Sequence, residues 1–514
     1  MNDIRAKLPF FTKAAFGVGS TGEVVFLGMF NGFIAIFYNQ AIGLSNSLIG
    51  TAIMLAMIGD AISDPLVGMI SDRWKSRLGR RHPFLFIAPI PLALSLFMVF
   101  SPPDMLTGGA SGEVNQTGLF VWLVCWTVLG RLFMTLFTIP HYALGGELTQ
   151  EPNDRAKLFS MDTLFGALSG TMFAVIVWGV FLAGETTLAD GSVIPRHLDK
   201  TAYPPVILTS CAIIIGALFL SALGTKHRIP LLSTPPVDQT RVSLSSFYRE
   251  LIGALKNPNY AFLMIGFFLL MISIGLDQTM SVFTATYFWE LSPEQIKWFG
   301  LVVLPGVIIG ATASPVLMRK FDRKPILIGA LLGVVVFAQL PIDLRLLGLM
   351  PANGSELLMP LLLGNIFLGT ISAAAGAVAM MSMLGDLTDE NEVLSGLRQE
   401  GLIYSARAFF AKASNSVGHF VGGIILDLFV VLPFEAVPGQ VDSDVIWRLG
   451  IMAGPIMGIA SIIALPFYMR YRLTRQRHEE ILDELEARRP STDAVADPEP
   501  KPDSDPDPAG LVKT

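Results

Sequence analysis

Two carboxylates stand in the middle of a long apolar stretch at about residues 47–72. Asp60 and Asp64 are four residues apart, with Ser63 beside them. In a helix this spacing puts both acids on one face, and a rise of about 1.5 Å per residue places Asp60 near the middle of a bilayer. Acids at that depth are costly unless they are paired or hydrated, and two close together repel each other. We therefore expect them to take up a proton or a hard cation such as Na⁺, with Ser63 and a hydroxyl from another helix as further oxygen ligands.

A deep lysine in a second stretch, at about residues 400–423, carries the opposite charge. Lys412 lies about twelve residues inside this run, so it needs an acid or an anionic ligand nearby. We expect it to be the electrostatic partner of the paired acids, with Arg407 as the other candidate. The alternative is that the acids only neutralise a buried cation, for which Arg131, Arg407 and Lys412 are the candidates.

Other reactive side chains give no sign of catalysis or metal binding. His141 and His419 lie in apolar runs without a second ligand at metal spacing, which favours structural histidines over a proton relay. The sequence has no phosphate-binding GxxxxGK motif followed by Ser or Thr, and no nucleophile with an adjacent base on one helix face. We predict neither an enzyme nor a bound cofactor.

The composition indicates what kind of chain must position these groups. Of 514 residues, 52% are hydrophobic and only 15% are charged, and the mean hydropathy is +0.57. These values exclude an ordinary soluble domain and give no sign of nucleic-acid binding. Apolar runs of roughly 21 residues recur along the chain and predict an all-α membrane protein with twelve transmembrane helices. They begin near residues 14, 47, 83, 118, 158, 203, 261, 296, 325, 356, 400 and 446, and the last ends near 471.

The distribution of Lys and Arg predicts the orientation. Twenty of them fall in the amino-terminal segment and in alternate connecting segments, against four in the remaining loops. Because basic residues concentrate on the cytoplasmic side, both termini are expected to face the cytoplasm. The expected location is the plasma membrane, or the inner membrane of a bacterium, with multiple passes.

An internal repeat divides the chain. The turn after the second run contains Asp72 and Arg73, and the turn after the eighth, about half the chain later, contains Asp322 and Arg323. Two six-helix halves are therefore predicted, at residues 1–225 and 259–472. A cytoplasmic loop at 226–258 with a short amphipathic helix joins them. An amphipathic helix at 473–489 and a disordered, acidic, proline-rich tail at 490–514 complete the chain.

Several stretches resemble the glycoside-pentoside-hexuronide:cation symporter family, the melibiose permease-like group of the major facilitator superfamily. They are FGVGSTGEVVF in the first run, DAISDPLVGMISD in the second, SRLGRRHPFL after it, IPHYALGGELT at the end of the fourth and LRQEGLIYSARAFFAK in the eleventh. The resemblance covers most of residues 11–470 and implies the major facilitator fold. It also implies that Asp60, Ser63, Asp64 and Thr135 occupy the cation-site positions and that Lys412 matches the family's lysine in helix 11.

The sugar side of the resemblance departs from the family pattern. Positions that bind the sugar there carry other residue types here: Glu23, Val24, Thr138, Tyr142 and Thr163. Galactoside recognition is therefore not expected. The candidates for substrate contact are Glu23, Thr138, Tyr142 and Lys412, with Tyr142 stacking on an apolar sugar face. The alternatives are that Tyr142 serves only packing and that Glu23 is a helix-end charge.

These observations lead to one hypothesis with two rivals. The chain would be a cation-coupled symporter, driven by Na⁺ or H⁺, that imports a small polar, glycoside-type substrate by alternating access. Asp72, Arg73, Asp322 and Arg323 would act as cytoplasmic gates. The rivals are a sodium-dependent symporter of lysolipids or other amphiphiles, and a transporter-like receptor that does not translocate. The expected partners are the substrate, the coupling cation and the bilayer, without nucleic acid, and we expect a monomer.

Overall fold

The computed structural model confirms an all-helical membrane architecture. It describes residues 7–108, 113–149, 151–187, 191–232, 249, 252–396 and 400–488. Within them, 12 helical spans are long and apolar enough to cross a bilayer, from Phe10–Ile42 to Ser443–Arg470. The central-loop helix falls largely, and the acidic tail wholly, outside the described residues. Both stay predictions, as do the domain boundaries.

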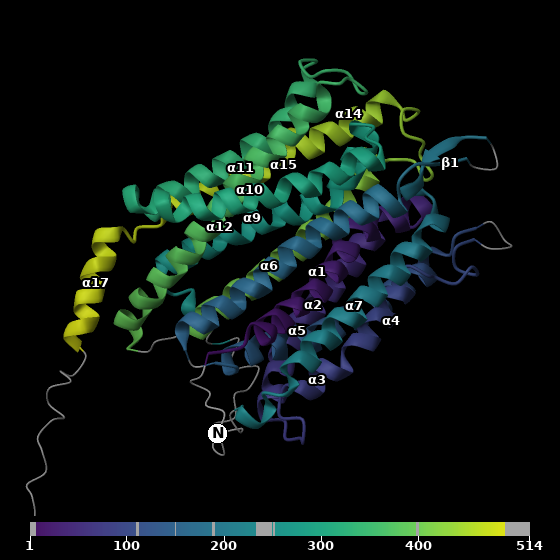
Figure 1. Ribbon diagram of the computed structural model, residues 1–514. Coiled ribbons are helices and arrows are strands. Elements are labelled where there is room, and N and C mark those ends of the chain that lie inside the picture. Colours follow the sequence, from purple (N-terminus) through teal and green to yellow (C-terminus); the bar gives the residue numbers. More distant parts are fainter. Residues whose placement is uncertain are drawn as a thin grey trace, which may run out of the picture.

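The first six spans form the bundle in the lower part of Figure 1. The third span is interrupted at Ala88, because the following Pro89 lacks the N–H that would continue the helical ladder. Their elements are α1 (Phe10–Ile36) with the π-helix η1 (Phe37–Ile42), α2 (Asn46–Arg73), α3 (His82–Ile87), α4 (Pro89–Val99), α5 (Gln116–Glu147), α6 (Pro152–Ile176) with the π-helix η2 (Val177–Phe181), and α7 (Tyr203–Lys226), with the short 3-10 helix η5 (Ile229–Leu231) after it.

The other six spans form the upper bundle of Figure 1. The twelfth span is divided into short pieces, with Pro455 inside its π-helical part and Pro466 in the first turn of its last helix. The elements are α9 (Pro258–Phe283) with η6 (Thr284–Phe288), α10 (Pro293–Lys320), α11 (Arg323–Leu346), α12 (Leu358–Ser395), α13 (Glu400–Ile425) with η7 (Leu426–Val430), and α14 (Ser443–Ile451), η8 (Met452–Ile456), α15 (Met457–Ile462) and α16 (Leu465–Arg470).

Helix packing follows the same scheme in the two bundles. α1 lies against α6 and α7, as α9 lies against α13 and α15. α2 lies against α5 as α10 lies against α12, and α4 lies against α5 as α11 lies against α12. The bundles meet where α2 contacts α13, α6 contacts α10 and α1 contacts α9. This repeated packing agrees with the two six-helix halves expected from the paired Asp-Arg turns.

Glycines let α2 and α13 cross closely. A Cβ atom on Gly50 would come within 2.6 Å of the His419 carbonyl oxygen, and one on Gly423 within 2.2 Å of the Asn46 carbonyl oxygen. Any larger residue at either position would push the two helices apart. The helix that carries the paired acids and the helix that carries Lys412 are therefore held in direct contact.

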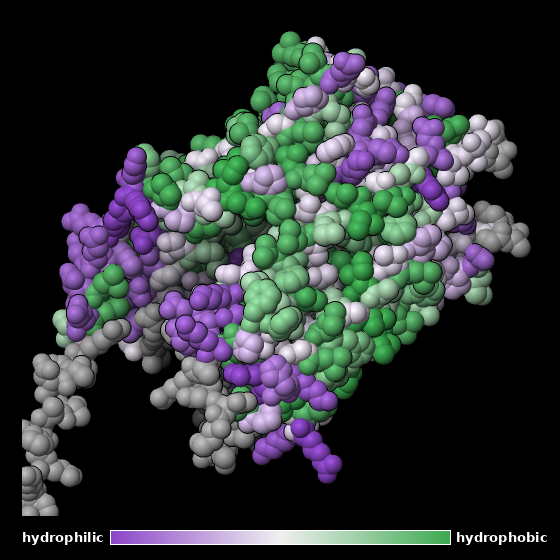
Figure 2. Space-filling view, in the orientation of Figure 1, coloured by the Kyte–Doolittle hydropathy of each residue, from purple (hydrophilic) through white to green (hydrophobic). Residues whose placement is uncertain are grey.

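The surface has the distribution of a protein that spans a bilayer. In Figure 2 apolar side chains cover the middle of the visible face, and hydrophilic ones gather mainly toward its two ends. The first turn of α1 and α17 (Arg475–Arg488) lie at the end predicted to be cytoplasmic (Figure 1). At the other end, the predicted outer end, β1 (Glu185–Thr187) pairs antiparallel with β2 (Val193–Pro195), followed by the 3-10 turns η3 (Arg196–Leu198) and η4 (Lys200–Ala202).

Candidate functional site

Asp60 lies on α2 and is buried at 2% exposure. Its Oδ2 accepts a hydrogen bond from Nε of Arg131 at 3.0 Å, and Nη2 of the same guanidinium also contacts it. Arg131 is itself buried and lies on α5, which packs along α2. Arg131, one of the three buried cations that the sequence offered as possible partners of the acids, is therefore paired with Asp60.

Asp64 lies one turn further along α2 and meets the second half of the molecule. Its Oδ1 accepts a hydrogen bond from Thr135 Oγ1 at 2.7 Å, and its Oδ2 lies 2.5 Å from Lys412 Nζ. The same ammonium lies 3.4 Å from Asp60 Oδ2. Arg407, the other candidate, lies instead over the ring of Phe267, 5.7 Å from its centroid. Lys412 is thus the cation that joins α13 to the paired acids.

Two buried oxygen atoms beside this ion pair lack a hydrogen-bond partner among the described residues: Asp60 Oδ1 and Ser63 Oγ. A cleft of about 320 Å³ between α2 and α13 is lined by Asp60, Asp64 and Lys412. Carboxylate and hydroxyl oxygens are the ligands that hard cations prefer. The structure brings Asp60, Asp64 and, through its hydrogen bond to Asp64, Thr135 together, whereas Ser63 and Thr135 do not line the cleft. A cation site at these residues stays a prediction.

The substrate candidates of the first half meet between α1 and α5. The Tyr142 hydroxyl donates a hydrogen bond to Glu23 Oε2 at 2.9 Å. Tyr142 is 41% exposed, so part of its side chain remains accessible. Thr138 lies one turn before it on α5 and is half-buried.

His141 has the surroundings of a structural histidine. Its ring stacks on Phe16 with a centroid distance of 4.0 Å, and its Nε2 lies 3.3 Å from Asp162 Oδ1. His419 is held in the same manner, with Nδ1 2.7 Å from Thr279 Oγ1. Asp162 was not singled out from the sequence, because an isolated acid early in a membrane helix resembles a helix-end charge.

The first predicted gate is an ion-pair cluster within the first half. Asp72 pairs with Arg81, which also lies 2.9 Å from Glu147 Oε1 and donates to Ser71 Oγ at 2.7 Å. Arg73 is exposed. Glu147 belongs to the helix that also carries Thr135, so the cluster ties the end of α2 to the end of α5. Sequence reasoning had not included Glu147.

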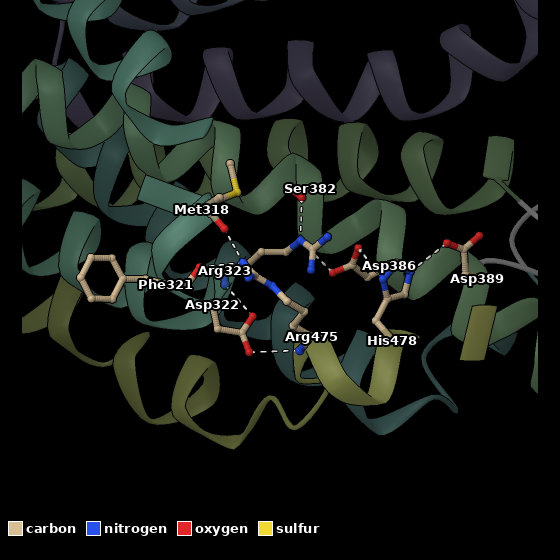
Figure 3. Close-up of polar contacts among 9 residues, drawn as sticks. All are labelled: Met318, Phe321, Asp322, Arg323, Ser382, Asp386, Asp389, Arg475 and His478. Atoms are coloured by element: carbon tan, nitrogen blue, oxygen red, sulfur yellow. Dashed lines mark hydrogen bonds and ion pairs between the residues drawn. The ribbon is translucent and has the colours of Figure 1, made fainter. Parts of the chain in front are cut away.

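The second predicted gate lies against the carboxy-terminal helix α17 (Figure 3). Asp322 accepts a hydrogen bond from the Arg323 amide at 2.7 Å, and its other oxygen accepts one from the Arg475 amide at 3.1 Å. The Arg475 guanidinium donates to the carbonyl oxygens of Met318 and Phe321 at the end of α10. Arg475 therefore covers the carboxyl end of one membrane helix, where a cation is favourable.

Further contacts in Figure 3 hold the next turn of α17 against α12. Arg323 Nε donates to Ser382 Oγ at 2.8 Å and lies 3.1 Å from Asp386 Oδ2. His478 lies between two acids of α12, with Nδ1 3.6 Å from Asp386 Oδ1 and Nε2 3.0 Å from Asp389 Oδ2. Both members of the second gate thus have partners within their own half.

A carboxylate links the two halves at the predicted outer end. Asp427, in η7, accepts hydrogen bonds from the amides of Asn46 at 3.0 Å and Ser47 at 2.7 Å. It also accepts one from Ser45 Oγ at 2.5 Å. The second half therefore caps the first turn of α2, where the helix dipole favours an anion. Asp427 was missed in the sequence because an acid at the end of an apolar run is ordinary.

Uncharged side chains form further contacts between the two halves at the predicted outer end. Gln40 Oε1 accepts hydrogen bonds from the Tyr287 hydroxyl at 2.9 Å and from the Ala436 amide at 3.0 Å. His197 Nε2 lies 2.9 Å from Thr286 Oγ1, and the His197 side chain is fully buried. Each of these contacts joins a residue of the first half to one of the second.

Twelve helices in two repeated halves, with a polar site between them, define a membrane transporter of the major facilitator type. The chain belongs to the MFS/sugar transport protein family, whose model matches residues 15–475. This confirms the superfamily and the symporter-like relationship expected from the sequence.

Several relatives are named as symporters or as transporters of sugars, and one as a putative exporter of 2,3-dihydroxypropane-1-sulfonate. An uncharacterized symporter of Synechocystis, sll1374, is 26% identical over 94% of this chain and 97% of its own length. The isoprimeverose transporter of Lactiplantibacillus pentosus is 23% identical over 90% of this chain and 89% of its own length. The inward open structure of the xylose transporter XylE from E. coli has a TM-score of 0.55 at 15% identity, covering 92% of this chain and 98% of that one. The last likeness concerns the fold alone.

Proposed function

We propose that this chain is a symporter that couples entry of Na⁺ or H⁺ to import of a small polar, glycoside-type substrate by alternating access. The observation that carries the proposal is the position of Lys412 Nζ, 2.5 Å from Asp64 Oδ2 and 3.4 Å from Asp60 Oδ2. A tethered ammonium lies where two membrane-embedded acids would otherwise attract a free cation. Because Lys412 belongs to the other half, exchanging it for a free cation changes the contact between the halves.

Competition for Asp64 provides the coupling. Arg131 pairs with Asp60 and Lys412 pairs with Asp64, so the four charges balance. A cation bound by Asp64, Thr135 and the unpartnered oxygens near them would displace Lys412, since two cations on one carboxylate repel strongly in a low dielectric. Binding energy that differs between two conformations shifts their populations.

The polar contacts between the halves support an inward-facing form, given the predicted orientation. Asp427 and Gln40 join the halves at the predicted outer end. At the predicted cytoplasmic end, Asp72 binds Arg81 of its own half and Asp322 binds Arg475 of α17. In the outward-facing form, the two turns with Arg73 and Arg323 would instead close the cytoplasmic end.

The substrate would bind beside the cation site. Glu23 and Tyr142 offer a carboxylate, a hydroxyl and an accessible ring, and Thr138 adds a second hydroxyl one turn away. Lys412, once displaced by the cation, would donate hydrogen bonds to the same substrate. We further propose that both termini face the cytoplasm and that the transporter acts as a monomer in the plasma membrane, or in the inner membrane of a bacterium.

Uptake into proteoliposomes tests the proposal. Labelled isoprimeverose and a panel of other neutral glycosides would be offered under an inward Na⁺ gradient, an inward proton gradient, or neither. We expect accumulation of at least one glycoside with one of the gradients, and none without. Asp64→Asn should keep the hydrogen bond to Thr135 but lose gradient-driven accumulation, whereas Asp104→Asn, which removes an exposed loop acid, should behave as wild type. Equal accumulation by Asp64→Asn and wild type would overturn the coupling role.

A further inference from the structure

Asp277 is a membrane-embedded acid outside the site described above. It lies on α9, about eleven residues, or roughly 16 Å, before the helical span ends at Phe288. Its side chain is exposed although it lies deep in the protein, because it lines a cavity of about 710 Å³ between the two halves. Among the described residues, the structure shows no hydrogen bond or ion pair to its carboxylate.

The cavity has one wall from the first half and the other from the second. Val24, Gly28 and Gly32 lie one turn apart along α1, and a Cβ atom on Gly32 would meet nothing within 4 Å. Small residues on this face therefore leave room between the halves. Aromatic side chains from both halves surround that room: Phe33, Phe173, Trp178, Trp289, Phe299 and Phe337.

Polar groups are few in these walls. Asp277 and Ser281 of α9 are followed on the same face by Thr284, the first residue of η6, and Asn365 joins them from α12. Asp277 is the one charged residue among the described residues that line the cavity. A space of this volume with apolar walls and a few polar groups is the usual form of a small-molecule site.

We propose that this cavity holds a ring of the transported substrate and that Asp277 accepts hydrogen bonds from its hydroxyl groups, which selects neutral polyhydroxylated substrates over anionic ones. The inference rests on the proposed function and extends it to the substrate class. A carboxylate without a protein partner needs donors when a ligand replaces the cavity water, and neighbouring hydroxyls on a sugar ring supply them in pairs. The aromatic walls suit the apolar faces of such a ring, whereas a carboxylate or sulfonate on the substrate would be repelled by Asp277.

Binding of three matched rings to the purified protein tests this selectivity. Methyl glucoside, methyl glucuronide and glucosamine are glucose-type rings that carry no charge, one negative charge and one positive charge, and calorimetry measures their affinities under saturating Na⁺ at low and neutral pH. We expect methyl glucoside to bind wild type at least about tenfold more tightly than methyl glucuronide. Asp277→Asn should weaken the binding of methyl glucoside by roughly tenfold and reduce the preference for methyl glucoside over methyl glucuronide. Asp277→Glu should restore part of the affinity for methyl glucoside.

Several results would overturn the inference. They are equal affinity for the neutral and anionic rings in wild type, tightest binding of glucosamine, unchanged affinity in Asp277→Asn, or binding of none of the three. Asp104→Asn serves as the matched control for loss of one acid. Gradient-driven uptake that is present but identical in wild type and Asp277→Asn would reject the role of Asp277 alone, whereas absence of gradient-driven uptake in wild type would reject the proposed function.

Discussion

The carboxylate of Asp427 accepts a hydrogen bond from the backbone amide of Ser47 at 2.7 Å, so the second half of the molecule caps the first turn of α2 in the first half. The contact lies at the predicted outer end, and the same helix carries Asp60 and Asp64 further along. Closure of the outer side and the position of the paired acids therefore depend on one helix.

Removing this cap should open the predicted outer end. Asp427→Ala deletes three charge-assisted hydrogen bonds and should raise the outward-open population by about tenfold or more. Spin labels on cysteines introduced at Met105 and Leu349, both in exposed outer loops, would report a longer distance in the variant. Asp444→Ala, at another exposed outer acid, is the control. An unchanged distance distribution would show that Asp427 does not hold the closure.

Loss of the buried counter-ion of Asp60 should be strongly destabilising. Arg131→Ala removes the nearer of two cations from a carboxylate buried at 2% exposure and leaves only Lys412, 3.4 Å away, which should lower the free energy of unfolding by about 3 kcal/mol. Thermal unfolding in detergent measures the effect. The double variant Arg131→Ala/Asp60→Asn should recover most of the loss, because it removes the uncompensated charge. A single variant as stable as wild type would contradict the pairing.

Hydropathy and charge sufficed to predict the twelve spans and the packing of the chain as two similar halves. The depth of Asp60, Asp64 and Lys412 in the bilayer stays a prediction. These features depend on local composition, since apolar length fixes the spans and the position within a run gives the expected depth. The sequence favoured Lys412 over Arg407 as the partner of the paired acids and named Arg131 only among the buried cations that the acids could neutralise. In the structure Arg131 and Lys412 are both used, because α5 and α13 lie on either side of α2.

Some residues of the site and its surroundings were not found from the sequence, for a different reason. Asp277 has no second acid one turn away and was not singled out, although its place inside an apolar run is the signal that could have found it. Its cavity arises only where the two halves face each other. Glu147 and Asp427 lie at helix ends, where charged residues are common, and their partners are far away in the sequence. The role of such a residue depends on which helix ends meet in the folded protein, and this cannot be predicted by reading each apolar segment separately.

A buried histidine should make stability depend on pH. Burial lowers the pKa of His197 from 6.5 to about 3, so the folded protein holds it neutral while the unfolded chain binds a proton. Stability is then full above pH 6.5 and falls as the pH drops toward 3, by about 2 kcal/mol between pH 7.5 and pH 5. Melting temperatures of wild type and His197→Gln across this range check the slope. His227→Gln, at an exposed histidine, should keep the wild-type slope; a wild-type slope in His197→Gln too would refute the assignment.

Docking of α17 should depend on Arg475 and not on Arg477. Arg475 binds Asp322 and the end of α10, whereas Arg477 contacts Glu480 and Glu484 of its own helix. Arg475→Ala should therefore speed tryptic cleavage within α17 several-fold, while Arg477→Ala should have little effect beyond removing its own site. The cleavage rate at Arg488 measures both. Equal rates in the two variants would mean that Arg475 does not anchor the helix.

Cation affinity in a Lys412→Met variant tests the competition for Asp64 most directly. Na⁺ binding would be measured by calorimetry at several pH values, so that proton binding is observed in the same titrations. With its tethered ammonium gone, Asp64 should bind Na⁺ or H⁺ at least about tenfold more tightly than in wild type, and uptake should lose its coupling. Unchanged or weaker binding of both cations would show that Lys412 does not occupy the place of the coupling ion.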